Sequence, residues 1–182
     1  MRWSGFLLTV GAGCGLATLE SGPGAGYLPA GAGGVLGNVI GNGLADRMQH
    51  DGWVETLLQS ELKGRQVSFR NMAFTGDTVT SRPRSKGFTS PEDYLKHCRA
   101  DVIFVMFGYN ESFGGEAKVS QFKDELGTMI DKYRGLKFNG TSAPRFVLFS
   151  PIAHENIRSP NLPDGTANNV NLALYTGVIQ QV

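Results

Sequence analysis

Residues 101–108, DVIFVMFG, carry the feature that most constrains the fold, a continuous apolar run without polar alternation. Such a run predicts a strand that is buried on both faces, as strands of parallel sheets are. Residues 35–41 (VLGNVIG) and 145–150 (RFVLFS) are similar runs, and 66–74 (QVSFRNMAF) predicts a further strand. The chain should therefore fold around a mostly parallel sheet.

Helical patterns alternate with these strands and are expected at 46–63, 90–99, 117–134 and 170–181. Residues 75–90 are rich in Thr, Ser, Gly, Arg and Pro and predict a loop. Strands that alternate with helices indicate an α/β fold with helices on both faces of the sheet. In the first helix the apolar side chains expected on one buried face are Met48, Trp53, Leu57, Leu58 and Leu62.

The first part of the chain is unlike the rest, because residues 1–43 hold 13 of the 25 glycines and only two charged residues, Arg2 and Glu20. One positive charge, an apolar stretch and small residues resemble a secretory signal, although the stretch is too short to cross a bilayer. We therefore expect a signal-like, flexible segment at 1–34, a globular domain at 35–182, and export to the periplasm or the outside. A cytoplasmic location stays open as the alternative.

Charge and composition exclude several function classes. Seventeen Lys and Arg balance sixteen Asp and Glu, so nothing in the charge favours nucleic acid as a partner. Two cysteines and three histidines without metal-ligand spacing predict neither a metal site nor another cofactor. No transmembrane segment is expected.

Polar loops follow each predicted strand: GNGLAD at 41–46, FTGDT at 74–78, GYNES at 108–112 and SPIAHEN at 150–156. The carboxyl ends of parallel strands meet at one edge of the sheet, where open α/β proteins bind ligands. Any one of these loops could merely turn the chain. Four together indicate a common pocket.

The motifs GNGLA, NMAFTGDT and GYNE, in this order at strand ends, resemble the first three conserved blocks of the SGNH, or GDSL-like, hydrolases. The longer stretches RMQHDGW, FGYNESFGGE and SPIAHEN resemble GDSL-like domains of large exported bacterial proteins. The resemblance covers about residues 35–182. It implies a flavodoxin-like three-layer sandwich and hydrolysis of ester bonds. A small-molecule ester or acylated sugar would be the substrate, and other domains of a longer polypeptide could be partners.

The resemblance also implies roles for individual residues. The backbone N–H groups of Gly43 and Gly76 and the side-chain amide of Asn110 would donate hydrogen bonds to the oxyanion that forms during ester hydrolysis. Asn71 would hold its loop in place. Asn42 and Tyr109 would contribute to substrate binding.

Four further residues of these loops are candidates from their position. His154 follows the last predicted strand and could act as a general base for water, or line the pocket. Thr75 and Asp77 lie in the second loop and could contact substrate or supply a nucleophile or an acid. Glu111 stands where the family has Asp, and it could be a pocket acid or a loop anchor.

The departures from the family pattern concern catalysis directly. Gly43 occupies the position of the nucleophilic Ser, Asn42 that of the preceding Asp, and no Asp-x-x-His occurs in the chain. We expect the protein to continue past Val182. The alternative to an esterase is a non-catalytic ligand-binding module of a larger exported protein. A dinucleotide site at Gly41-x-Gly43 is disfavoured, because Asp46 stands where its fingerprint has a third glycine.

Overall fold

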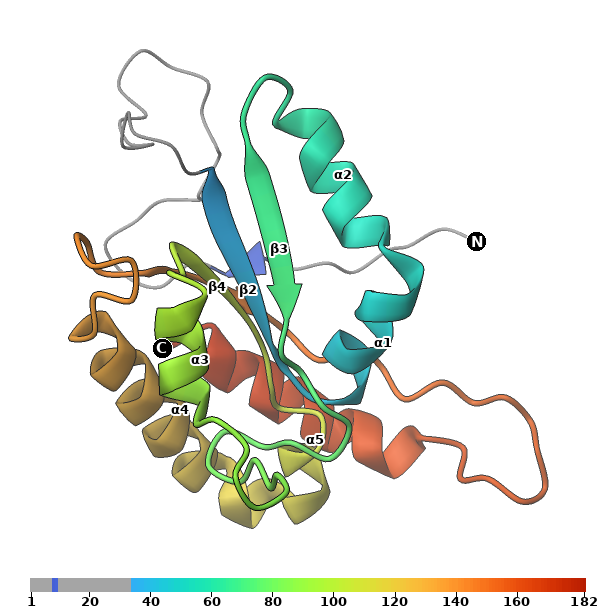
Figure 1. The fold of residues 1–182 in the computed structure, drawn as a ribbon. Helices are drawn as coiled ribbons and strands as arrows, with labels where there is room; N and C mark the ends of the chain where they lie inside the picture. Colours follow the sequence, from blue (N-terminus) through green and yellow to red (C-terminus); the bar gives the residue numbers. More distant parts are fainter. Residues whose placement is uncertain (1–7, 10–33) are drawn as a thin grey trace.

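The computed structural model describes residues 8–9 and 34–182 and contains a five-stranded sheet of order β1-β5-β4-β2-β3 (Figure 1). β1 (Leu8–Thr9) pairs antiparallel with β5, and all other pairs are parallel. The four parallel strands are β2 (Val35–Gly41), β3 (Val67–Asn71), β4 (Val102–Met106) and β5 (Arg145–Phe149). Apart from β1 and Gly34, the predicted signal-like segment 1–34 lies outside the described residues.

Strand order places the ligand-binding edge. From β2 the chain moves to β3 at one edge and then returns to β4 on the other side of β2, the flavodoxin-like order. The switch point therefore lies between the carboxyl ends of β2 and β4, where Gly41 pairs with Met106. Ligands of such sheets bind just beyond this point.

Helices cover both faces of the sheet, which confirms the predicted three-layer α/β fold (Figure 1). One face carries α1 and α2, and the other carries α3, α4 and α5. The helices are α1 (Gly43–Asp51), α2 (Trp53–Glu61), α3 (Pro91–His97), α4 (Val119–Arg134) and α5 (Thr166–Ile179). Two short 3-10 helices, Glu111–Gly114 and Glu116–Lys118, precede α4.

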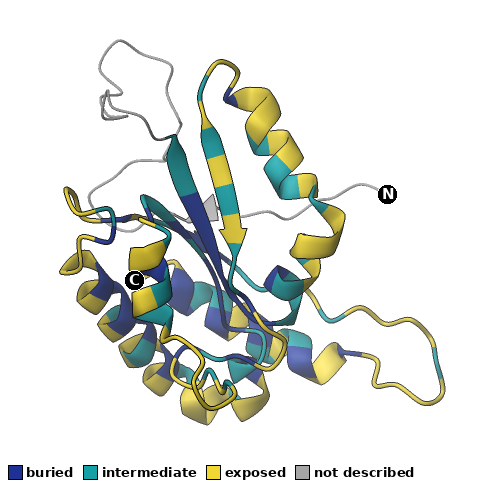
Figure 2. Ribbon diagram, in the orientation of Figure 1, coloured by how far each residue is buried: buried dark blue, intermediate teal, exposed yellow. Residues whose placement is uncertain are grey.

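The larger core lies between the sheet and α3, α4 and α5, where Figure 2 shows most of the buried surface. Leu95, Ile103 and Tyr175 are fully buried there, and the rings of Phe122 and Tyr175 lie 5.0 Å apart. Burying a side chain of this size contributes about 1.5–3 kcal/mol. This core fixes α4 and α5 beside the loop that follows β4, because both helices contact its 3-10 helix Glu111–Gly114.

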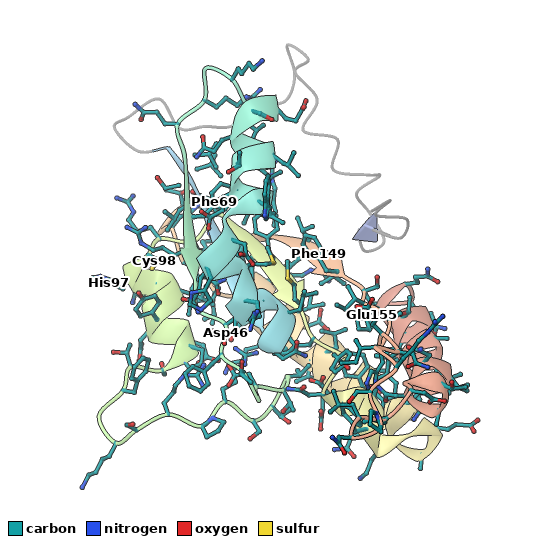
Figure 3. All side chains as sticks on the ribbon, turned by 90° about the vertical axis from the view of Figure 1, so that its right-hand side faces the viewer. Asp46, Phe69, His97, Cys98, Phe149 and Glu155 are labelled. Carbon is teal, nitrogen blue, oxygen red and sulfur yellow. The ribbon has the colours of Figure 1, made fainter. Side chains whose placement is uncertain are left out.

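The opposite face depends on a glycine. Phe69 of β3 and Phe104 of β4 lie on either side of β2, with ring centroids 6.0 Å apart. A Cβ on Gly37 of β2 would lie 2.9 Å from Cδ1 of Phe69 and 3.0 Å from Cε2 of Phe104. The rings therefore meet over β2 because position 37 has no side chain. The row continues to Phe149, whose ring centroid lies 6.0 Å from that of Phe104. Figure 3 labels its two outer members, Phe69 and Phe149.

The prediction of one helix at 46–63 was wrong. Gly52 adopts the left-handed conformation, with φ 60°, and ends α1 as its C-cap before α2 begins. The break turns α2 away from the predicted face, and Trp53 and Leu57 are 72% and 62% exposed. Met48 still packs against the core, and Leu62 is buried.

The other boundaries differ less. β3 ends at Asn71 rather than at 74, because the side chain of Asn71 accepts the N–H of Ala73 and turns the chain. α5 begins at Thr166, four residues before the predicted start. Residues 75–90 contain neither helix nor strand, as predicted.

Candidate active site

The turn between β2 and α1 is fixed by its neighbours at the switch point. The N–H of Asn42 donates to the carbonyl of Met106 at 3.3 Å, and the N–H of Phe74 donates to the carbonyl of Gly41 at 3.3 Å. A Cβ on Gly41 would lie 2.6 Å from the Met106 carbonyl oxygen. The turn, the loop after β3 and the end of β4 are thus held as one unit.

Asn42 itself is 2% exposed, and its Nδ2 has no hydrogen-bond partner among the described residues. A buried amide nitrogen without a partner costs free energy, and Asn38 and Asn168 contain such nitrogens as well. The Asn42 side chain lies directly before the first turn of α1.

Gly43 begins α1, where the first N–H groups of a helix have no partner within the helix. A Cβ at this position would meet a single heavy atom within 4 Å, Oγ1 of Thr75 at 3.8 Å. Position 43, where the hydrolases that the sequence resembles have their nucleophilic Ser, is therefore open space facing Thr75.

The loop after β3 is tied to α1 through two side chains. Nδ2 of Asn71 donates to the Ala45 carbonyl at 2.6 Å, and Oδ1 of Asn71 accepts the N–H of Ala73 at 2.9 Å. Asn71 therefore contacts both α1 and the start of its own loop. Oγ1 of Thr75 donates to Oδ2 of Asp46 at 2.7 Å, so Thr75 is held beside the turn (Asp46 is labelled in Figure 3).

Gly76 follows Thr75 with φ +94°, in the left-handed region, and is exposed. Within residues 34–182 the Gly76 N–H donates no hydrogen bond. The Gly76 N–H is therefore available to a ligand.

Asp77 and Asn110 are joined, but not as two groups that face a substrate. Nδ2 of Asn110 donates to the backbone carbonyl of Asp77 at 2.9 Å. The Asp77 carboxylate is 2% exposed and accepts two hydrogen bonds of 2.7 Å from the guanidinium of Arg84. Hydrogen bonding to Asp77 raises the pKa of Arg84, although partial burial opposes it. The side chains of Asp77 and Asn110 therefore both hold the loop that follows β3.

Glu111 is also a loop anchor. Oε1 accepts the N–H of Val79 at 2.9 Å and Oε2 accepts the N–H of Gly108 at 2.8 Å. Burial raises the pKa of the Glu111 carboxyl above its ordinary value, although these hydrogen bonds oppose the shift. Glu111 thus ties the loop after β3 to the end of β4.

His154 lies in the long loop between β5 and α5 and is clamped by one residue of α5. Asn169 accepts the His154 N–H at 2.7 Å and donates to its carbonyl at 3.0 Å. The imidazole lies 6.3 Å from the Tyr109 ring, and its buried Nδ1 has no partner among the described residues. Within residues 34–182 no carboxylate is hydrogen-bonded to the ring, and the neighbouring Glu155 is exposed.

The structure thus brings Gly43, Thr75 and Asp46 together, links Asp77 with Asn110, and pairs Tyr109 with His154. No contact among the described residues joins His154 to position 43. Ser112 is fully buried, with its hydroxyl donating to the Tyr109 carbonyl at 2.6 Å, so it does not face a ligand.

Sequence reasoning missed the arginines of the loop after β3. Arg82 and Arg84 line an open cavity of about 190 Å³ together with Phe74, Phe88 and Tyr94. The sequence signal for this cavity is Arg-Pro-Arg at 82–84. Two arginines this close to a predicted ligand loop are candidates to bind a carboxylate or a ligand.

The described part of the chain contains neither a metal-ligand cluster nor a membrane-spanning helix. Residues 8–9 and 34–182 contain no group of three or more His, Cys, Asp or Glu side chains that could hold a metal ion. None of the helices within these residues has the length and apolar character that crossing a membrane requires.

Fold and site together define an α/β protein of flavodoxin-like topology with a candidate site at the switch point of its sheet. The sequence matches no protein-family model and no curated protein. BT4096, a gut microbial diltiazem-metabolizing enzyme, shares the fold with a TM-score of 0.53 and 16% identity. That match covers 78% of this chain and 33% of the other, so this chain spans about a third of that protein's length.

Two further solved structures are similar at TM-scores of 0.48. TesA is 18% identical over 79% of this chain and 69% of its own. The lipase Lip_vut3 from a goat rumen metagenome is 14% identical over 78% of this chain and 74% of its own.

Proposed function

We propose that this chain is an SGNH/GDSL-like hydrolase-type domain that binds an ester, such as an acylated sugar, at the turn of Gly41–Gly43. The observation that carries the proposal is the open space at Gly43, at the start of a helix and beside Thr75. Free N–H groups at a helix start attract an oxyanion or a carbonyl oxygen. The Gly76 N–H is the second donor that the proposal uses.

Gly43 cannot be a nucleophile, and we assign any turnover by this chain to an attacking water. His154 is the proposed base for that water, with Nε2 as the proposed proton acceptor, because Nδ1 is buried without a partner among the described residues. We expect slow hydrolysis, because a donor pair without an activated nucleophile retains only part of the rate of a complete triad.

The test is hydrolysis of 4-nitrophenyl acetate by the full chain, by Gly43→Ser and by Gly43→Ala. Serine fits the open space and supplies a hydroxyl, whereas alanine adds the same Cβ without one. We expect Gly43→Ser to exceed both other proteins by about tenfold or more, as expected of an added nucleophile. Equal rates for the serine and alanine variants in folded protein would contradict the proposal.

A second candidate function is ligand binding without turnover, as a module of a larger exported protein. This function is favoured by the Asn110 amide, which donates a hydrogen bond to the Asp77 carbonyl instead of facing a substrate. The two functions differ in His154→Ala. This variant lowers hydrolysis by the unmodified chain if His154 is the base. A binding module would show ester binding in calorimetry and no turnover above a heat-killed control. Its ester affinity would be the same in His154→Ala. Export remains part of both proposals, and N-terminal sequencing of the secreted protein tests it.

A further inference from the structure

A cavity of about 190 Å³ opens between the loop that follows β3 and the start of α3. Its wall includes Arg82, Arg84, Phe74, Phe88 and Tyr94, and it also reaches Gly41 at the switch point. The volume is below the roughly 300–1,000 Å³ of pockets for drug-sized ligands, so it suits a molecule with a single ring. We call it the loop cavity.

Arg84 brings no net charge to the loop cavity. Its guanidinium is bound by both oxygens of the Asp77 carboxylate at 2.7 Å, and the two side chains are 19% and 2% exposed. A pair with this two-point geometry is satisfied and needs no ligand.

Arg82 differs from Arg84, because all of its hydrogen bonds go to neutral acceptors. Nη1 donates to the Tyr133 hydroxyl, Nη2 to the Val79 carbonyl and the Met129 sulfur, and Nε to the Thr78 carbonyl. The guanidinium also lies 4.9 Å from the centroid of the Phe107 ring. Four hydrogen bonds leave one of the five N–H groups of the guanidinium, on Nη1, without a partner among the described residues.

No ion pair neutralises Arg82 among the described residues. Glu92 of α3 interacts with it electrostatically, but the Glu92 carboxylate accepts a hydrogen bond of 2.7 Å from Lys132. Arg82, Lys132 and Glu92 together therefore keep one positive charge behind the loop cavity. A partly buried charge of this kind favours an anion in the cavity.

The entrance of the loop cavity is aromatic. Phe74 and Phe88 line it and are 55% and 63% exposed, and the Arg84 guanidinium lies 4.8 Å from the Phe74 centroid. Exposed phenyl rings beside a hollow offer flat apolar surface to a planar group. The positive charge of Arg82 therefore suits an anionic group of a ligand, and the exposed rings of Phe74 and Phe88 suit a planar apolar group.

We propose that the loop cavity binds a small organic anion with a planar apolar body, an aryl carboxylate, whose carboxylate meets Arg82 while its ring lies between Phe74 and Phe88. This site does not depend on the proposed ester hydrolysis, because it needs no nucleophile and no turnover. It adds a binding site for a ligand class that the candidate active site does not require.

Calorimetric titration of the full chain with benzoate, and with benzyl alcohol as its neutral analogue, tests the proposal. Benzoate should bind about tenfold tighter or more than benzyl alcohol, the effect expected of one charge-assisted hydrogen bond. Arg82→Gln should remove that preference, and Arg82→Lys should keep part of it. Arg47→Gln is the matched control, because Arg47 is exposed on α1 and does not line the cavity.

Equal affinities for benzoate and benzyl alcohol overturn the proposal, as does an Arg82→Gln protein that is folded and binds benzoate like Arg47→Gln. Because Arg82 also bonds Tyr133 and Met129, its loss could unfold the chain, so Phe88→Ala provides a second test. Phe88 is exposed, and its loss should weaken benzoate binding severalfold without altering the unfolding curve. Unchanged benzoate affinity in Phe88→Ala also overturns the proposal.

Discussion

The guanidinium of Arg84 donates to both carboxylate oxygens of Asp77 at 2.7 Å, and this ion pair fixes the loop that follows β3. The same Asp77 carries the carbonyl that accepts the Asn110 amide. Asp77 therefore connects the loop that follows β3 to the loop that follows β4.

Replacing Asp77 by Asn should destabilise the protein by about 3 kcal/mol, the lower end of the range for breaking a buried ion pair. The estimate is at the lower end because the Arg84 side chain keeps 19% exposure and can recover some hydration. Urea unfolding followed by circular dichroism measures the loss. Asp131→Asn is the control, because Asp131 pairs with Arg134 on the surface at 77% and 51% exposure. It should change stability by less than about 0.5 kcal/mol. Similar losses in the two variants would contradict the structural role of Asp77.

The space around two glycines of the same turn predicts opposite effects of alanine. Gly43→Ala should stabilise the protein by about 0.5 kcal/mol, because the Cβ meets nothing closer than 3.8 Å and the unfolded chain loses freedom. Gly41→Ala should destabilise it by about 2 kcal/mol or more, because its Cβ would lie 2.6 Å from the Met106 carbonyl oxygen. Urea unfolding of both variants gives the comparison. Equal destabilisation would mean that position 43 is not open, and the proposed function would lose its main support.

Asn71→Ala should cost about 2 kcal/mol, because it leaves the Ala45 carbonyl and the Ala73 N–H without their partners. It should also loosen the loop that carries Thr75 and Gly76, so ester binding should weaken along with stability. Thermal unfolding and calorimetric titration measure the two effects. Asn161→Ala, in an exposed loop, is the control and should stay within about 0.5 kcal/mol of the parent.

The sequence allowed β2, β4 and β5 to be predicted well because these strands are largely buried, whereas β3 alternates between half-buried and exposed residues and β1 was not predicted. The bounds of β2 agree with the predicted 35–41 to the residue, but the loop predicted at 41–46 was wrong in part, because α1 already begins at Gly43. The break at Gly52 was missed, because an isolated glycine inside a helical pattern is usually tolerated. Only the packed structure shows that Gly52 takes φ 60° and exposes Trp53.

The side-chain partners of the site could not be predicted in the same way. Asn110 and Glu111 contact residues 33 and 32 positions away, and no local pattern specifies which atoms meet across such a distance. The Arg84–Asp77 pair, seven residues apart, was within reach of sequence reasoning, since opposite charges in one short loop are candidates to pair.

The pH dependence of stability should show the effect of burying Glu111. Burial raises the pKa of this carboxyl above its ordinary value of 4.5, so the folded protein holds the proton more tightly than the unfolded chain. The stabilisation is complete below the unfolded pKa and is lost as the pH rises through the folded pKa. The free energy of unfolding of the parent, minus that of Glu111→Gln, should therefore fall as the pH rises from about 4.5. The slope cannot exceed about 1.4 kcal/mol per pH unit for one group.

Urea unfolding of both proteins at several pH values between about 4.5 and 8 measures this difference. The slope is the readout rather than the offset, because glutamine also loses one of the two hydrogen-bond acceptors that hold Val79 and Gly108. Glu61→Gln, at the exposed end of α2, controls for the loss of one carboxylate. A difference that is flat or rises with pH would mean that the two N–H donors stabilise the ionised Glu111 more than burial opposes it. In that case the anchor between the two loops would be a charged one.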